Sequence, residues 1–189
     1  MLHGIDVASY NPMFDAEGLD FVFVKATEGR SYINPRRADQ AARARHAGCV
    51  VGFYHFLHGR RGLRPARIAA QARYFLEHCG AEDGDILALD WETDPKGRLA
   101  TSGQKDHFLH EVKKRRPDHR LVLYANRDLW TRKSTGHYNA DGLWIADYRK
   151  AGDPLVHDWL FHQYTSKPLD KNVAKFKTRD ALKHWASSG

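Results

Sequence analysis

Residues 86–97 read ILALDWETDPKG, and this stretch decides how the chain folds. Four apolar residues lead into Asp90, Trp91 and Glu92, and Asp-Pro and Lys-Gly turn signals follow them. This pattern predicts a buried strand that ends at the acidic residues. Because side chains alternate along a strand, Asp90 and Glu92 point to one face and Trp91 points to the other. Two neighbouring carboxylates repel each other and lose hydration on burial, so their placement requires a functional reason.

Six further segments are also short, apolar and rich in aromatic or β-branched residues, as interior strands are. They lie at 3–9, 20–27, 50–57, 121–126, 143–148 and 159–164. Amphipathic helical patterns separate the earlier strands, at 35–46, 65–79 and 102–116. Strand–helix alternation predicts a parallel sheet with helices outside it. After residue 143 the strands follow one another too quickly for full crossover helices, so we expect the final part to be mostly β.

The composition is that of a single soluble globular domain, with 189 residues, 42% hydrophobic and 28% charged. No stretch approaches the ~20 apolar residues of a membrane helix, and the N-terminal MLHGIDVASY has no signal-peptide pattern. Cys49 and Cys79 form no metal motif and no disulfide framework. Buried thiols are expected there, and a single bridge stays open. The formal charge of +7 favours polyanions, whether nucleic acid, anionic membrane or anionic cell-wall polymers.

Polar and aromatic residues stand at the C-terminal ends of all seven predicted strands. In parallel α/β barrels the active site lies at that end of the strands. One such residue is usually a turn or a cap, but seven successive strand ends favour convergent functional groups. The residues are Asp6, Lys25, Glu28, Tyr54, His55, Asp90, Glu92, Tyr124, Asn126, Asp147, Tyr148, Gln163 and Tyr164.

Paired carboxylates among aromatic residues are typical of glycoside hydrolysis. One carboxylic acid protonates the leaving oxygen, while another carboxylate stabilises or attacks the developing oxocarbenium centre. Repulsion between Asp90 and Glu92 predicts a raised pKa for one of them, which supplies an acid that is protonated near neutrality. Aromatic residues at the same mouth can stack on sugar faces, although each alone is more often a core or rim residue. They are Tyr54, Trp91, Tyr124, Tyr148 and Tyr164.

Other chemistries fit less well. Ligand-type side chains for a metal occur without the compact spacing of known sites, so neither a metal nor another cofactor is expected. A nucleophilic serine elbow and a phosphate-binding glycine loop are both missing. The basic segments 34–45 and 110–120 are predicted to be solvated helix faces that also attract anionic polymers. A nucleic-acid-binding role would use them, but it would leave Asp90 and Glu92 unexplained.

Eight motifs occur in one order along nearly the whole chain: GIDVASYN, FVFVKATEG, AGCVVGFYHF, LALDWE, LVLYAN, LWIADY, FHQYT and LDKNVAKF. Each is weak alone, but the series is specific. With it the sequence resembles the family-25 glycoside hydrolases, the muramidases (lysozymes) that cut bacterial peptidoglycan. The resemblance implies a flattened, TIM-like (β/α)₅β₃ barrel of the α/β class. A single catalytic domain over 1–189, like that of a phage endolysin, is expected, with no separate cell-wall-binding module.

The resemblance also implies hydrolysis of the β-1,4 bond from N-acetylmuramic acid to N-acetylglucosamine. Glu92 then matches the general acid/base. Asp90 matches a residue that stabilises the transition state, or that orients the substrate's N-acetyl group if that group is the nucleophile. Asp6 and Asp170 match carboxylates that shape the surrounding charge and hydrogen bonding. Substrate-binding positions follow from the same match and, for Tyr148, from the strand-end pattern: Tyr54, Tyr124, Trp144, Tyr148 and Gln163.

The sequence is consistent with two functions, one catalytic and one non-catalytic. The first is an enzyme, a monomeric endolysin kept in the cytoplasm until it is released to act on the wall, or a secreted enzyme if a targeting segment was removed. Its partners would be peptidoglycan and, by charge, anionic wall polymers, without nucleic acid or membrane insertion. The second is a non-catalytic wall carbohydrate-binding barrel that kept the fold and the groove. A polyanion-binding protein is a more distant alternative.

Overall fold

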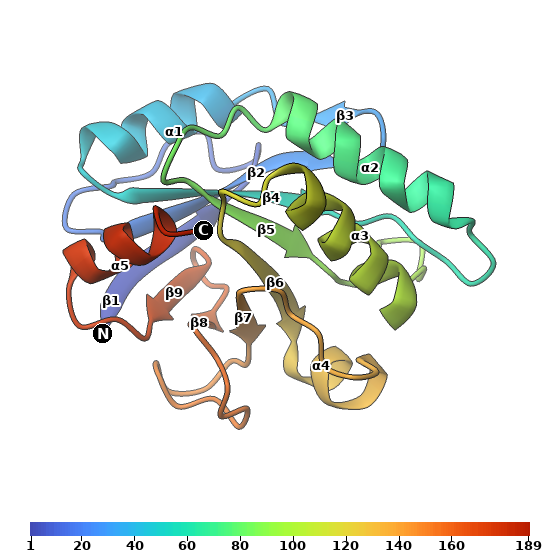
Figure 1. Ribbon diagram of the computed structural model, residues 1–189. Helices are drawn as coiled ribbons and strands as arrows, with labels where there is room; N and C mark the ends of the chain where they lie inside the picture. Colours follow the sequence, from blue (N-terminus) through green and yellow to red (C-terminus); the bar gives the residue numbers. More distant parts are fainter.

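Parallel strands with helices outside them close into a barrel in the computed structural model, which describes residues 1–189 (Figure 1). β1 pairs with both β2 and β9, which closes a ring of eight strands, and the two-residue β3 (Tyr32–Ile33) pairs antiparallel with β2 outside that ring. Within the ring only β9 runs antiparallel to both of its neighbours. The ring consists of β1 (Leu2–Val7), β2 (Phe21–Glu28), β4 (Val50–Phe56), β5 (Ile86–Asp90), β6 (Leu121–Asn126), β7 (Gly142–Ala146), β8 (Phe161–Thr165) and β9 (Lys171–Ala174). The predicted (β/α)₅β₃ barrel is confirmed.

Three of the five helices lie where the sequence predicts them, and local signals set their ends. Pro65 is the first residue of α2, a position where its missing N–H costs no hydrogen bond. The side chains of Thr101 and Gln104 form a reciprocal capping box that begins α3. The helices are α1 (Arg37–His46), α2 (Pro65–His78), α3 (Ser102–Arg115), α4 (Arg127–Lys133) and α5 (Arg179–Ala186). None of them is both long and apolar enough to cross a membrane.

Two helices and two strands were not predicted as elements. α4 spans two turns, too few for a periodic pattern, and its N-cap Asn126 is also the last residue of β6. α5 follows the cap residue Thr178 and makes the last part of the chain less exclusively β than expected. β3 and β9 have only two and four residues, which is too short for alternation to be recognised.

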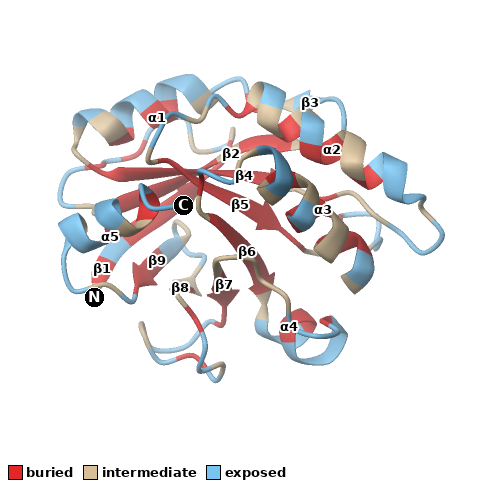
Figure 2. Cartoon of the chain, viewed as in Figure 1, coloured by how far each residue is buried: buried red, intermediate tan, exposed pale blue.

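Alternation along the strands divides the core into two layers. Residues facing the barrel axis form an inner cluster, in which Phe23 stacks on Trp144 with ring centroids 4.3 Å apart. Residues facing outward pack under the helices, in an outer cluster that includes Phe53 of β4, Phe75 of α2 and Phe108 of α3. Because the strands are apolar on both faces, they are red, that is buried, along most of their length in Figure 2, whereas the helices alternate between buried and exposed residues.

Helix α5 covers the end of the barrel at which the parallel strands begin. Its Leu182 and Ala186 belong to the inner cluster and are almost fully buried. Trp185 of the same helix packs near Phe161, the first residue of β8, with ring centroids 6.2 Å apart. The opposite end, where the parallel strands finish, is therefore the accessible end of the interior.

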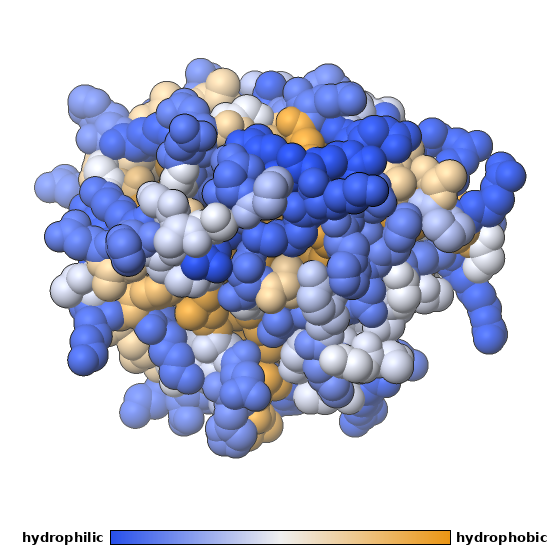
Figure 3. Space-filling view, viewed as in Figure 1, coloured by the Kyte–Doolittle hydropathy of each residue, from blue (hydrophilic) through white to orange (hydrophobic).

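Hydrophilic side chains dominate the molecular face in Figure 3, and apolar atoms show between them only in small patches.

Gly52 of β4 faces the barrel axis at a position where there is no room for a side chain. A Cβ atom added there would lie 2.3 Å from the ring of Phe23 and 3.3 Å from the Ile86 carbonyl oxygen. We expect Gly52→Ala to lower the free energy of unfolding by about 1–3 kcal/mol, because the aromatic interior has no room to relax. Gly103→Ala is the matched control, since nothing lies within 4 Å of a Cβ at that helical position. Urea denaturation of both variants checks this, and equal effects would contradict it.

Candidate active site

Four carboxylates line one hollow of about 220 Å³ at the accessible end of the barrel. Asp6 belongs to β1, Asp90 ends β5, and Glu92 follows two residues later. Asp170 directly precedes β9, and because β9 runs antiparallel to β1, its beginning lies at the rim where the parallel strands end. The Asp6 N–H accordingly donates to the Asp170 carbonyl at 3.2 Å. The structure thus brings together the four acidic residues that the sequence singles out.

A groove of two adjoining hollows surrounds these carboxylates. We call the 220 Å³ space the central hollow, and a neighbouring space of about 280 Å³ the side hollow. Glu92, Tyr124 and Tyr148 line both hollows, so they form the wall between them. All five predicted substrate-binding residues line the central hollow. Its other lining residues are Ala8, Tyr10, Lys25 and Phe56.

Asp6 is fixed by two amides from the strands that close the barrel. Its Oδ2 accepts a hydrogen bond of 2.9 Å from Gln163 Nε2 on β8 and one of 2.7 Å from Asn172 Nδ2 on β9. Both amides are buried, so neither donor has a competing partner in solvent. The carboxylate therefore has a single orientation set by three strands.

The other ends of these two amides are also occupied. Gln163 Oε1 accepts from the hydroxyls of Tyr124 at 3.0 Å and Tyr148 at 3.2 Å. Asn172 Oδ1 accepts from the indole N–H of Trp144 at 2.7 Å. The polar atoms of Gln163 and Trp144 are thus used within the protein. These two residues therefore contact a ligand mainly through the shape of the surface that they form at the bottom of the central hollow.

Burial raises the pKa of every carboxyl group in the central hollow. Loss of hydration, followed by repulsion from Asp170, raises the pKa of Asp6 to about 7, although the two amides oppose the shift. Burial and then the charge of Glu92 raise the pKa of Asp90 well above its usual value. Burial also raises the pKa of Glu92, against a lowering effect of the nearby Tyr124 hydroxyl, and that of Asp170. Repulsion within the Asp90–Glu92 pair was predicted as the cause, but loss of water is the larger one.

Lys25 is the only basic residue that lines the central hollow. Its Nζ lies 2.6 Å from Glu28 Oε2 and 5.0 Å from the centre of the Phe56 ring. The ammonium lowers the pKa values of Asp90 and Glu92, so it partly offsets the effect of burial. Lys25 has the same strand parity as the inward-facing Phe21 and Phe23, and this parity could have identified it as a groove residue.

Two further residues of the site could not be predicted from the sequence: Asn172, which holds Asp6, and Tyr10, which lines the central hollow. Asn172 lies on the short β9, where too few residues alternate to show which of them face the interior. Tyr10 follows β1 in a loop and is 73% exposed, so no periodicity marks it.

Several strand-end residues do not reach the groove, because alternation turns them outward. His55 is buried beneath α2 and α3, where its Nδ1 lies 2.8 Å from Thr27 Oγ1 and its ring stacks on Phe108. Burial lowers the pKa of His55 to about 3. Trp91 is fully buried in the outer layer and donates to the Ala100 carbonyl, and Tyr164 packs against the same layer. The suggestion that Trp91 and Tyr164 stack on sugars is therefore wrong.

Asn126 and Asp147 line the side hollow, but both already have structural partners. The side chain of Asn126 caps α4 by accepting from the Leu129 N–H. Asp147 pairs with Arg127 at 3.1 Å and accepts the Leu155 N–H at 3.0 Å. These residues shape the side hollow more than they offer free groups to it.

One cluster has the spacing of metal ligands, and it lies outside the groove. Asp83, Asp118 and His119 bring ligand atoms within 4.8 Å of one another, before the start of β5 and β6. His119 Nε2 is 2.7 Å from the Arg116 guanidinium, which would repel a cation there. The cluster therefore has no evident part in the chemistry of the groove.

Comparison with known proteins agrees with this geometry. The sequence profile described as Glycosyl hydrolases family 25 matches residues 5–173, and the chain belongs to this family. An N,O-diacetylmuramidase of Chalaropsis sp is 31% identical, over 85% of this chain and 84% of that protein. A lysozyme of Lactococcus phage mv1 is 27% identical over 88% and 89% of the two chains. The solved structure of a muramidase from Acremonium alcalophilum superposes with a TM-score of 0.82, at 28% identity, over the whole of both chains.

The raised pKa of Asp6 predicts a pH-dependent stability difference. Between about pH 4 and pH 7 the folded protein holds a proton on Asp6 that the unfolded chain has lost, so this group makes stability fall as pH rises. Asp6→Asn keeps an acceptor for both amides and removes the titration. We expect the stability of Asp6→Asn, relative to that of the native protein, to increase by at most about 4 kcal/mol from pH 4 to pH 8. Melting temperatures of both proteins across this pH range measure the difference. Asp83→Asn, at an exposed site, is the control, and a constant Asp6→Asn offset across pH would contradict the assignment.

Proposed function

We propose that the protein is an N-acetylmuramidase that hydrolyses the β-1,4 bond between N-acetylmuramic acid and N-acetylglucosamine in bacterial peptidoglycan. The observation that carries the proposal is the position of Glu92. It stands in the wall between two adjoining hollows, beside three further carboxylates. A glycan that occupies both hollows has its bridging oxygen near that wall.

Glu92 is the proposed general acid and base. Burial raises its pKa, which helps it to keep a proton near neutrality. It delivers this proton to the leaving oxygen and then accepts a proton from the attacking water. Its partial exposure, in contrast to the buried Asp90, leaves it accessible to both the sugar and water.

Asp90 is the proposed partner at the sugar centre. Its Oδ1 is buried and has no hydrogen-bond partner within the protein, so an unsatisfied acceptor is available to a substrate donor. The N–H of an N-acetyl group is such a donor, and holding it would orient that group if its carbonyl is the nucleophile. Otherwise Asp90 stabilises or attacks the oxocarbenium centre directly. Asp6 and Asp170 complete the cluster of carboxyl groups around the sugar, with Asp6 fixed by its two amides.

Aromatic rings supply the proposed sugar-binding surfaces. Tyr54 and Tyr124 are buried in the floor, whereas Tyr10 and Tyr148 are 73% and 62% exposed at the rim. Exposed aromatic rings beside a polar groove are suited to stacking on sugar faces. Trp144 and Gln163 support that floor from below.

The wider proposal follows from this activity. The enzyme would act on the cell wall as a monomeric catalytic unit of the endolysin kind, over residues 1–189, without a cofactor. Peptidoglycan would be its substrate, and the +7 charge would attract the anionic polymers of the same wall. No role with nucleic acid is proposed, because such a role would leave the carboxylates of the groove unexplained.

The reaction is tested by incubating purified peptidoglycan with the protein and identifying the new reducing sugar. N-acetylmuramic acid at the new ends supports the proposal. N-acetylglucosamine ends would identify a different glycosidase, and no new ends together with retained binding would identify a non-catalytic barrel.

The different roles proposed for Glu92 and Asp90 give a further prediction. Glu92→Gln keeps the size of the side chain but has no proton to donate, and should lose about 10²–10⁴-fold in activity on peptidoglycan. A synthetic glycoside with a good leaving group needs little protonation, so this variant should recover much of its activity there. Asp90→Asn should show no such recovery, because its role is at the sugar centre.

Steady-state rates of both variants on the two substrates measure this difference. Thermal unfolding serves as the control, and Glu92→Gln should be as stable as the native protein or slightly more so, since one of two repelling carboxylates is removed. If both variants respond alike to the leaving group, the roles assigned to Asp90 and Glu92 are wrong.

A further inference from the structure

A third hollow of about 320 Å³ opens beyond the groove, and its charged lining is entirely basic. We call it the arginine pocket. Its residues follow β2, β4 and β5 or begin α2, so it shares the accessible end of the barrel with the groove. It is lined by Gly29, Arg30, His58, Gly59, Arg60, Leu63, Arg67, Gln71 and Arg98.

Three of the four arginines that line this pocket are not paired with acidic residues. The side chains of Arg30, Arg60 and Arg67 take part in no ion pair and no hydrogen bond within the protein. Arg98 does pair with Asp94, with 2.6 Å between Nη2 and Oδ2. The Asp94 carboxylate also accepts the N–H groups of Lys96 and Arg98, so it is already saturated. The three arginines are exposed to solvent around one hollow, where their charges attract an anion that can lie between them.

The beginning of α2 adds to this unbalanced charge. Helices usually carry acidic residues in the first turn, since the N-terminal end of the helix dipole is positive. α2 has none there, no side chain caps it, and its N-cap residue is Arg64. Arg67 lies in the same first turn and lines the pocket. A bound anion would interact favourably with both this helix end and the charge of Arg67.

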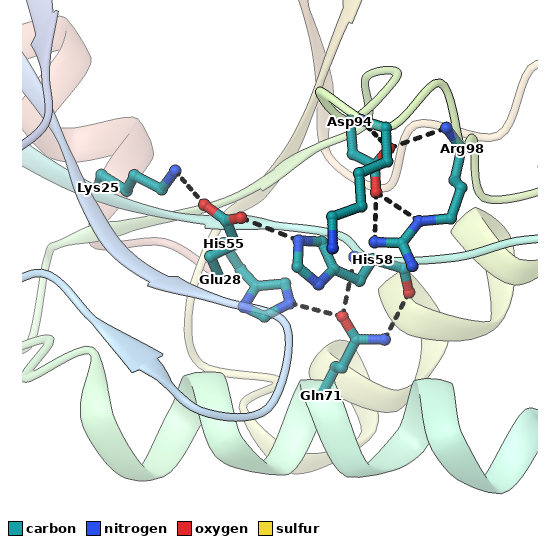
Figure 4. Close-up of polar contacts among 8 residues, drawn as sticks. Lys25, Glu28, His55, His58, Gln71, Asp94 and Arg98 are labelled. Atoms are coloured by element: carbon teal, nitrogen blue, oxygen red, sulfur yellow. Dashed lines mark hydrogen bonds and ion pairs between the residues drawn. The ribbon is translucent and has the colours of Figure 1, made fainter.

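The frame of the pocket is fixed and is linked to the groove (Figure 4). His58 Nε2 lies 2.9 Å from Glu28 Oε1, while the other oxygen of Glu28 accepts from Lys25 of the central hollow. Gln71 holds the backbone of His58 from the opposite side, accepting its N–H at 2.9 Å and donating to its carbonyl at 2.7 Å. One carboxylate thus joins the wall of the pocket to the wall of the groove.

We propose that the arginine pocket binds phosphate groups of a phosphodiester polymer in the bacterial wall. Guanidinium groups bind phosphate oxygens through paired hydrogen bonds. Three of them, aided by a helix N-terminus, suit a tetrahedral anion with several free oxygens better than a single carboxylate. The polymer would hold the enzyme on the wall while the groove engages the glycan, so the two contacts reinforce each other. The wall location of this ligand rests on the proposed function.

The test compares two triple variants that both lower the net charge from +7 to +4. One replaces Arg30, Arg60 and Arg67 with Ala. The control replaces Lys114, Lys133 and Lys183 with Ala, since these are exposed, unpaired and spread over α3, α4 and α5. Binding is measured on purified walls that contain a phosphodiester polymer and on the same walls after chemical removal of that polymer.

We expect the arginine variant to bind intact walls at least about tenfold more weakly than the native protein, and the control variant to lose much less. Loss of one hydrogen bond to a charged group already corresponds to about this factor. On stripped walls all three proteins should bind alike. Equal losses in the two variants would reduce the effect to net charge and overturn the proposal. A deficit of the arginine variant that persists on stripped walls would overturn it too, because the ligand would then be a carboxylate of the peptidoglycan.

Hydrolysis of a short soluble glycan keeps this test separate from the proposed function. The arginine variant should cleave such a glycan at the native rate, since none of its three substitutions lines the groove. If even the native protein leaves the glycan intact, the muramidase proposal fails, while the phosphate-dependent wall binding is still decided by the wall assay.

Discussion

The carboxylate of Asp6 is the contact on which the shape of the groove depends. It lies on β1, the strand at which the barrel closes, and it accepts amide hydrogen bonds from β8 and β9. Through these amides it also sets the positions of two tyrosine hydroxyls and of the Trp144 indole. A slip of β9 by one residue would turn Asn172 outward and remove one of the two donors to the buried Asp6 oxygen. The register of the closing strands therefore also determines the architecture of the site.

The central hollow gathers four carboxylates against one lysine, and this imbalance is tolerated because bound protons neutralise part of the negative charge. Burial raises the pKa of each acidic group, so part of the charge is neutralised near neutrality without any bound ion. Lys25 is held by Glu28 on the side away from the interior and draws the pKa values of Asp90 and Glu92 back down. A carboxyl group that exchanges its proton easily under such opposing influences is suited to proton transfer.

Much of this arrangement could be predicted from the sequence, because long apolar strands with polar ends carry a strong pattern. The four acidic residues and the barrel came from that pattern together with the family motifs. His55 was misplaced because a strand-end position was read without its parity, although Tyr54 beside it faces inward. Asn172 and the brief elements α4 and β3 could not be predicted, since only tertiary pairing gives so few residues a defined structure. The arginine pocket combines segments that are about 70 residues apart in the chain, from Arg30 to Arg98, and no local pattern joins them.

The closure of the barrel by β1, β9 and α5 also dictates the order in which the molecule can be completed during synthesis. β1 emerges from the ribosome before the other strands of the ring, whereas its neighbour β9 and the helix that seals the interior are translated after them. Until then β1 has a free edge on one side, and the aromatic interior is open at the end that α5 will cover. Contacts between the two ends of a chain are slow to form, because the intervening loop must first be closed. A nascent fragment that ends before β9 lacks Asp170 and Asn172, so the groove is complete only after this segment has been translated.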